Sequence, residues 1–182
     1  MKKSNILSSR DKWQDLANKR GSVTESEFSK NLKMLLPKHF TVIHKPNKNI
    51  IYSNNKGVEL DTLVINNNTN KGVYFEIKSG ENGGNAHERA CKFLSPIANA
   101  IKESVEKTTN ITLLEQPIWF GFSGKTFNSK KAYRHGKENK SVDPLKYREE
   151  ISIAFSNHKY FLLGVDTEKC DEVVKSLITH LS

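Results

Sequence analysis

Two predicted strands and a glycine-rich loop lie close together near the middle of the chain. Residues 57–65 (Gly-Val-Glu-Leu-Asp-Thr-Leu-Val-Ile) predict one strand, and residues 73–78 (Val-Tyr-Phe-Glu-Ile-Lys) predict a second. The polar segment between them has hairpin composition. Successive side chains in a strand point to opposite faces, so Glu76 and Lys78 are expected to share one face, opposite Phe75. A carboxylate and an amine are thus predicted on one rigid surface, just before the loop of residues 79–84.

The other segments alternate between helical and extended patterns. Helices are predicted for residues 11–20, 22–36, 85–107 with an interruption near Pro96, a short segment from Asp143-Pro144, and 167–181. Further strands are predicted for residues 40–44, 117–123, 151–155 and 158–165, with a loop at 45–56. The inward helical residues are predicted to be Phe28, Leu32, Leu35, Leu36, Val173, Val174, Leu177 and Ile178. This alternation predicts a three-layer α/β/α fold with helices flanking a central mixed sheet, and 182 residues suit a single domain, 1–182.

Asp61 and the triplet Glu76-Ile77-Lys78 form an acid followed by E-x-K on adjacent predicted strands. Two neighbouring carboxylates repel each other unless a cation lies between them. Asp61, Glu76 and the Ile77 carbonyl oxygen are hard ligands, for which magnesium is the expected ion. Lys78 would orient or deprotonate the attacking water and offset charge on phosphorus. The pattern therefore predicts a phosphodiester hydrolase.

Other arrangements compete with this interpretation. Surface strands often pair an acid with a base, and a second triplet, Glu138-Asn-Lys140, occurs in a polar segment without a strand or a close partner acid. Glu25 fits a helix capping box with Ser22, which competes with a catalytic role. The histidines lack zinc-ligand spacing, and no glycine loop ends in Lys-Ser/Thr.

Charge and side-chain chemistry favour a nucleic-acid partner without proving it. The net charge is +9, which favours a polyanion, although a solvated lysine-rich surface gives the same value. Six lysines and arginines lie between residues 124 and 140, where a DNA-contacting loop and a solvated loop are equally compatible with the sequence. Asn85 and Arg89, four apart at a predicted helix start, suit adenine and guanine edges in the major groove, but they also suit an ordinary capped helix.

Together these motifs resemble a known family. The segment Gly84-Asn-Ala-His-Glu-Arg89 is similar to the G-N-A-x-E-R sequence of the EcoRI/MunI family of type II restriction endonucleases. Asp61 with Glu76-Ile77-Lys78 resembles that family's PD...(D/E)xK active site, and Leu60 replaces the proline. Segments similar to those of the family occur in the same order from the region of Trp13 to the strand and helix after Tyr160. The similarity is closest to the MunI branch of the family.

The resemblance implies a homodimer that cuts a palindromic DNA duplex with Mg²⁺ and leaves four-base 5′ overhangs. It implies catalytic roles for Asp61, Glu76 and Lys78. Residues implied to read the inner AATT bases are Gly84, Asn85, Ala86 and Arg89. Glu88 would brace Arg89 or its symmetry mate, and Lys92 would contact the DNA backbone. The flanking bases of the recognition site are left open.

Two rival functions remain at this point. One is a structure-selective repair or junction nuclease on the same scaffold, and the other is a non-catalytic basic DNA-binding protein. The cysteines, Cys91 and Cys170, are expected to be free thiols. No apolar run approaches the length of a membrane span and the N-terminus is polar, so a cytoplasmic location is expected.

Overall fold

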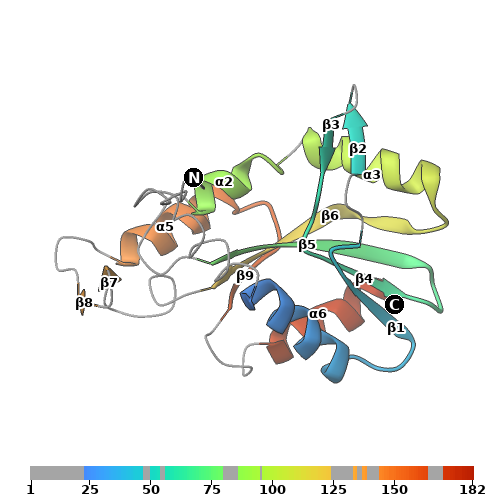
Figure 1. Ribbon diagram of the computed structural model, residues 1–182, viewed down its shortest axis with the longest axis horizontal. Helices are drawn as coiled ribbons and strands as arrows, with labels where there is room; N and C mark the ends of the chain where they lie inside the picture. The colour runs from blue at the N-terminus through green and yellow to red at the C-terminus, as the bar shows by residue number, and fades with distance from the viewer. Residues whose placement is uncertain are drawn as a thin grey trace, which may run out of the picture.

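The computed structural model describes residues 23–46, 50–53, 56–79, 86–94, 96–123, 133–134, 137–138, 144–163 and 170–182. The central sheet has five strands in the order β1-β4-β5-β6-β9 (Figure 1). Their bounds are β1 Phe40–His44, β4 Thr62–Asn66, β5 Lys71–Ser79, β6 Thr112–Ser123 and β9 Tyr160–Leu163. Two small hairpins pair β2 (Ile50–Ser53) with β3 (Lys56–Val58) and β7 (Tyr133–Arg134) with β8 (Lys137–Glu138). The helices are α2 (Ala86–Cys91), α3 (Ile97–Thr108), α5 (Pro144–Ala154) and α6 (Cys170–Leu181), and residues 23–35 are also helical.

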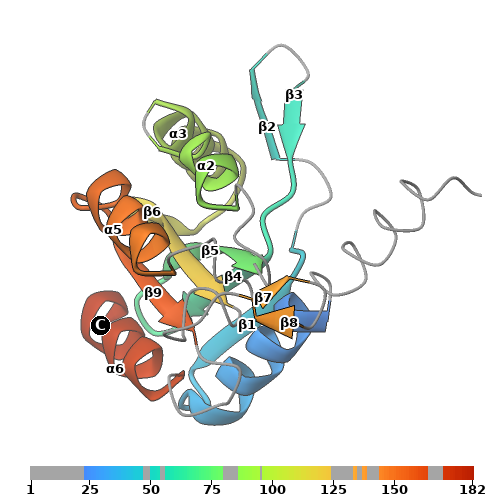
Figure 2. The same cartoon turned by 90° about the vertical axis from the view of Figure 1, so that its left-hand side faces the viewer.

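Helices cover both faces of this sheet, as Figure 2 shows end-on. On one face α2, α3 and α5 pack against a cluster that includes Tyr74 and Phe120. On the other face residues 23–35 and α6 pack against a cluster that includes Phe75 and Trp119. Burial of both faces of the sheet accounts for the apolar runs at residues 73–75 in β5 and 118–122 in β6. The predicted three-layer α/β/α fold with a mixed sheet is confirmed.

Strand directions place several strand ends at the same edge of the sheet. β4 pairs antiparallel with both β1 and β5, whereas β5, β6 and β9 are parallel. The end of β1 therefore lies beside the beginning of β4, with His44 opposite Thr62. The second half of β5 runs past the same point, with Phe75 opposite Thr62. The residues just before β4 and the residues after Phe75 are thus brought together.

The predicted strand at 151–155 is wrong, because these residues belong to α5 and the turn that follows it. Ile151 and Phe155 are both fully buried, whereas Ile153 is 70% exposed. Side chains four residues apart share a helix face, so the apolar alternation that suggested a strand also fits a helix. The helix begins at Pro144, where a fixed φ and a missing N–H are tolerated.

Four further predictions need correction. Residues 45–56 are not all loop, because they contain β2 and the start of β3. The predicted strand 57–65 is split, since Glu59, Leu60 and Asp61 separate β3 from β4. Leu35 is 44% exposed and Ile178 is 38% exposed, so neither is a core residue.

The interruption near Pro96 is confirmed by the separate helices α2 and α3. The predicted strands at 40–44, 117–123 and 158–165 correspond to β1, β6 and β9. The predicted helix at 11–20 lies outside the described residues. Among the residues that the structure describes, no helix is long and apolar enough to span a membrane.

Candidate active site

Asp61 is held by backbone bonds immediately before β4. Its own N–H donates to the Phe75 carbonyl oxygen at 3.1 Å, which continues the β4–β5 pairing by one residue. Its carbonyl oxygen accepts the Lys45 N–H at 2.9 Å. Its Oδ2 accepts the Ile77 N–H at 2.6 Å. Leu60, which stands where the family motif has proline, is fully buried in the core and anchors the segment.

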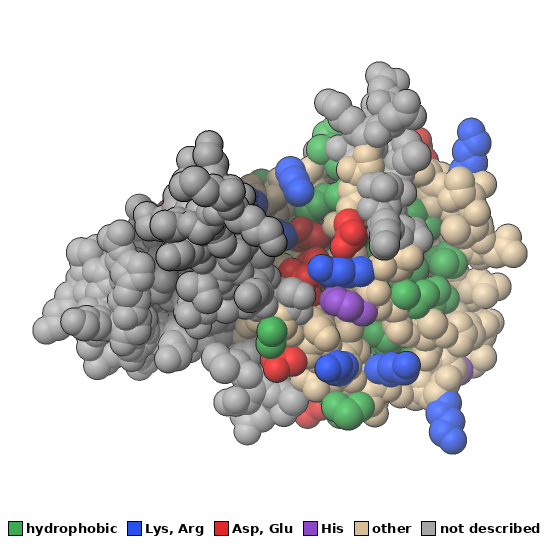
Figure 3. All heavy atoms as spheres, in the orientation of Figure 1, with side chains coloured by type: hydrophobic (Ala, Val, Ile, Leu, Met, Phe, Trp, Pro, Cys, Tyr) green, Lys and Arg blue, Asp and Glu red, His purple; other side chains and the backbone are tan. Residues whose placement is uncertain are grey.

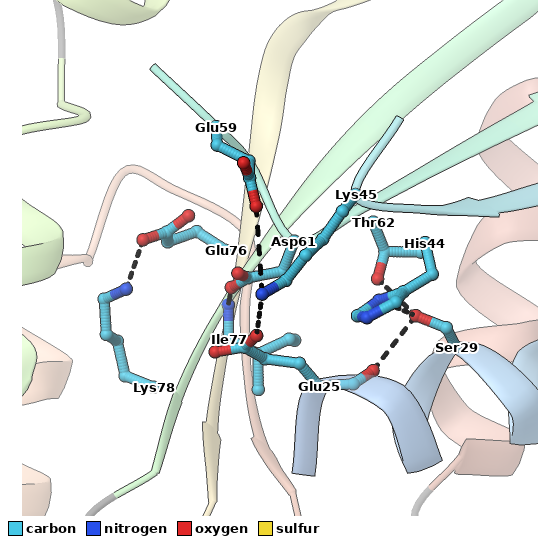
Figure 4. Close-up of polar contacts among 10 residues, drawn as sticks. All are labelled: Glu25, Ser29, His44, Lys45, Glu59, Asp61, Thr62, Glu76, Ile77 and Lys78. Carbon is cyan, nitrogen blue, oxygen red and sulfur yellow. Dashed lines mark hydrogen bonds and ion pairs between the residues drawn. The ribbon is translucent and has the colours of Figure 1, made fainter. Parts of the chain in front are cut away.

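Glu76 and Lys78 lie on the face of β5 opposite Phe75 and Ile77. Phe75 and Ile77 belong to the cluster under α6, while Tyr74 belongs to the cluster under α3, as strand alternation predicts. Glu76 is 4% exposed and accepts a hydrogen bond from the Lys78 ammonium through Oε1. Its other oxygen, Oε2, is buried and has no hydrogen-bond partner among the described residues. Figure 4 shows both carboxylates beside the same stretch of β5.

Burial and mutual repulsion perturb the two acids. Burial, then the negative charges of Glu76 and Glu25, raise the pKa of Asp61 from 3.8 to about 7, although the Ile77 N–H and Lys78 act in the opposite direction. Burial also raises the pKa of Glu76, against the opposing effect of Lys78. Buried carboxylates that resist ionisation typically mark functional sites, because folding tolerates the cost only where a ligand or cation relieves it.

Three further charged side chains, Lys45, Glu25 and Glu59, lie near Asp61 (Figure 4). The Lys45 ammonium lies 3.3 Å from Glu25 Oε2 and 3.8 Å from Glu59 Oε1. Burial lowers the pKa of Lys45, but the charges of Glu25, Glu59 and Asp61 outweigh it and raise the pKa overall. Figure 3 shows acidic side chains gathered on this face beside lysine and histidine side chains. Glu25 thus faces the site with its carboxylate paired to Lys45, while the proposed capping partner Ser22 lies outside the described residues.

A hydroxyl network fixes the helix of residues 23–35 to the strand that carries the site. Ser29 Oγ lies 2.7 Å from Thr62 Oγ1 and 3.2 Å from His44 Nδ1, and it donates to the Glu25 carbonyl oxygen at 3.0 Å. Ser29 and Thr62 are buried, and Thr62 follows Asp61 directly. The positions of Glu25 and Asp61 are therefore coupled through this network.

The donor set of the site fits a hard divalent cation. Asp61 and Glu76 supply carboxylate oxygens, and the unpartnered Glu76 Oε2 is a buried acceptor without a compensating donor in the described part of the chain. The described residues contain no group of three or more His, Cys, Asp and Glu side chains arranged around one ion. A cation at Asp61 and Glu76 would therefore complete its shell with backbone oxygen, water or substrate, as magnesium commonly does.

The end of α2 lies close enough to this site for electrostatic interaction. The positive charge of Lys92 acts on Glu76 and lowers its pKa, against the larger effect of burial. Ala90 and Phe93 anchor the segment in the core, while Glu88, Arg89 and Lys92 are exposed. Gly84 and Asn85 lie outside the described residues, and nothing is described of the Ala86 side chain.

The structure thus brings together the predicted catalytic residues Asp61, Glu76 and Lys78 with Ile77, which was predicted as a metal ligand. Sequence reasoning missed Lys45, Glu59, Ser29 and Thr62, and it favoured a capping role for Glu25. No local pattern connects these residues, because they meet through the pairing of β1 with β4. Glu138 of the second E-x-K triplet lies in β8, so the prediction that this segment has no strand is wrong, and the other two residues of the triplet lie outside the described residues.

Comparison with known proteins identifies the fold and the family. The fold is similar to that of the crystal structure of MunI restriction endonuclease in complex with cognate DNA, with a TM-score of 0.51 and 17% sequence identity, over 79% of this chain and 83% of that chain. No curated protein matches the chain. The family described as type II restriction enzyme MunI matches residues 1–181. The chain therefore belongs to the MunI family of type II restriction enzymes and is a site-specific endonuclease.

Proposed function

We propose that the chain is a magnesium-dependent endonuclease that cuts both strands of a palindromic DNA site with an AATT core and leaves 5′ overhangs. The observation that carries the proposal is the pair of buried carboxylates, Asp61 and Glu76, with Lys78 on the same strand as Glu76 and a buried Glu76 oxygen that has no hydrogen-bond partner among the described residues. The G-N-A-x-E-R resemblance supports the AATT core. The DNA-bound state of the similar MunI structure supports a duplex partner.

In the proposed mechanism, Asp61, Glu76 and the Ile77 carbonyl oxygen would hold one hard cation. Magnesium there would supply Lewis-acid chemistry, polarising the phosphoryl group and making the attacking water easier to deprotonate. Asp61 is kept in orientation by the Ile77 N–H, which restrains its Oδ2 at 2.6 Å. Preorganised ligands of this kind add to the rate because they do not have to rearrange during the reaction.

Lys78 positions the nucleophile in this proposal. Its ammonium contacts Glu76, so it lies beside the proposed metal ligand rather than at a distance from it. The ammonium orients the attacking water and offsets the negative charge that develops on the phosphorus oxygens, whereas accepting the proton of that water requires the neutral amine form of Lys78. The side chain is only 14% exposed, which limits its alternative contacts with solvent.

Base recognition is proposed for the segment that follows β5. Gly84, Asn85, Ala86 and Arg89 would read the inner bases, Glu88 would brace Arg89, and Lys92 would contact a phosphate. Of these, Arg89 and Lys92 are exposed on an anchored segment, as DNA contacts require. A homodimer would then read one half-site per chain and cut one strand per chain.

Digestion of plasmid and genomic DNA with Mg²⁺, followed by sequencing of the cut ends, tests the proposal. Fragment ends that all begin with 5′-AATT are expected, and the bases beside that core would complete the recognition site. Cleavage of branched DNA without cleavage of linear duplex would instead identify a structure-selective nuclease. Sedimentation of the chain as a monomer in the presence of a cognate duplex would contradict the proposed dimer.

Asp61→Ala separates catalysis from binding. The variant is expected to lose Mg²⁺-dependent cleavage because one of the two carboxylate ligands is gone, while it still binds the cognate duplex selectively. Glu103→Gln, an exposed substitution on α3, is the control and should cleave like the wild type. Unchanged cleavage by Asp61→Ala would remove Asp61 from the reaction.

A further inference from the structure

Lys45 has an unusual backbone beside the carboxylates. Its φ is 47°, a left-handed conformation that glycine and asparagine adopt more readily than lysine. The residue follows β1 directly, and its N–H donates to the Asp61 carbonyl oxygen at 2.9 Å. Such strained conformations cluster at functional sites when the side chain or the geometry is needed there.

The Lys45 side chain links two acids that belong to different segments. Its ammonium lies 3.3 Å from Glu25, on the helix of residues 23–35, and 3.8 Å from Glu59, before β4. Figure 4 shows the ammonium between these carboxylates and next to Asp61. The side chain is 38% exposed, so the ion pairs are open to competition from dissolved cations.

The charges in contact around the site leave room for one divalent cation. When a bound cation keeps all four acids ionised, Glu25, Glu59, Asp61 and Glu76 contribute four negative charges, and Lys45 and Lys78 contribute two positive charges in direct ion pairs with three of them. The remainder of two negative charges matches one divalent ion. Lys92, in the turn after α2, acts on Glu76 and further reduces the negative field. A second divalent ion would have to displace Lys45 from Glu25 and Glu59.

We propose that Lys45 is a positioning residue that holds Glu25 and Glu59 away from the metal ligands and limits each chain to one divalent cation at Asp61 and Glu76. This inference rests on the proposed function, since it concerns the cation of that reaction. The positive charge of the Lys45 ammonium takes the place of a second metal ion between Glu25 and Glu59. Without it, Glu25 and Glu59 are free to bind that second ion.

Three variants separate charge from backbone. Lys45→Asn removes the ammonium but suits the positive φ, because asparagine tolerates this conformation. Lys45→Arg keeps the positive charge. Lys38→Asn is the matched control, because it removes an exposed lysine in the turn after the helix of residues 23–35.

The readout is the number of Mn²⁺ ions bound per chain without DNA, counted by electron paramagnetic resonance of free Mn²⁺. One ion is expected for the wild type, Lys45→Arg and Lys38→Asn, and two are expected for Lys45→Asn. The Mg²⁺ dependence of cleavage should become cooperative in Lys45→Asn alone. Two ions on the wild type would overturn the proposal, and this count decides even if Lys45→Asn fails to fold.

The test distinguishes this inference from the proposed function. One ion on both the wild type and Lys45→Asn, with equal affinity and intact cleavage, overturns the role of Lys45 alone. A wild-type chain that binds no Mn²⁺, or binding that survives unchanged in Asp61→Asn, overturns the metal site itself and the inference with it.

Discussion

Asp61→Asn is expected to stabilise the metal-free protein while it abolishes cleavage. The pKa of Asp61 is raised from 3.8 to about 7 by burial and by the charges of Glu76 and Glu25. A group whose folded-state pKa is raised favours folding only in its neutral form. The contribution of neutral Asp61 to the free energy of unfolding is fully present below the pKa of the unfolded chain, and it is lost as the pH rises through 7. The wild-type chain therefore loses stability between about pH 4 and pH 7, and the neutral asparagine does not.

The magnitude follows from the difference between the two pKa values. At about 1.4 kcal/mol per pH unit, the ionised Asp61 costs the metal-free fold about 4 kcal/mol at pH 8. Asparagine keeps an oxygen that accepts the Ile77 N–H, so that hydrogen bond is retained. The pKa of about 7 already includes the opposing effect of Lys78, and a gain of about 2–4 kcal/mol is the expected result.

Urea unfolding in EDTA, followed by circular dichroism, measures this gain at pH 8 and pH 4.5. The advantage of Asp61→Asn should be large at pH 8 and small at pH 4.5. Glu103→Gln, which removes an exposed charge on α3, should change the unfolding free energy by less than about 0.5 kcal/mol. Excess Ca²⁺ should stabilise the wild type and leave Asp61→Asn unaffected. An Asp61→Asn protein that is less stable than the wild type at pH 8 in EDTA would refute the claim that burial and the neighbouring acids disfavour the ionised form of Asp61.

Three other substitutions test separate parts of the account. Lys78→Met should reduce cleavage by at least about 100-fold, as loss of a positioned acid–base group does, while Ca²⁺-dependent cognate DNA binding persists; equal loss of both would make Lys78 a binding residue. Arg89→Ala should weaken cognate binding by about 1–3 kcal/mol more than non-specific binding, and equal losses in a filter-binding assay would reduce Arg89 to a phosphate contact. Gly121→Val should destabilise the fold by about 1–3 kcal/mol and lower the cleavage rate, because even a Cβ there lies 2.6 Å from Ile77 Cδ1; wild-type kinetics would show that Ile77 adapts without moving Asp61.

Strand alternation predicted the orientation of β5 correctly. Val73, Phe75 and Ile77 lie in one core cluster and Tyr74 in the other, so the position of Glu76 and Lys78 on a shared face followed from the sequence. The spacing of the buried residues Ile151 and Phe155 did not distinguish a helix from a strand, because side chains four residues apart share one face in both. Tertiary packing against Phe120 and Phe122 decides in favour of the helix.

Local sequence patterns could not predict that Glu25 and Lys45 lie beside Asp61. Glu25 and Lys45 meet beside Asp61 only because the helix of residues 23–35 packs under β1 and β4. Glu25 also matched a capping box, a common local role that obscured its long-range contact. The positive φ of Lys45 has no sequence signal of its own, since lysine is an unfavourable residue for that conformation.

Anomalous scattering from a crystal of the chain with Mn²⁺ tests the central claim most directly. The account predicts one manganese peak per chain, within coordination distance of an Asp61 carboxylate oxygen and of Glu76 Oε2, with Lys45 still paired to Glu25. A peak that is absent from these two carboxylates, or one bound elsewhere in the chain, would contradict it.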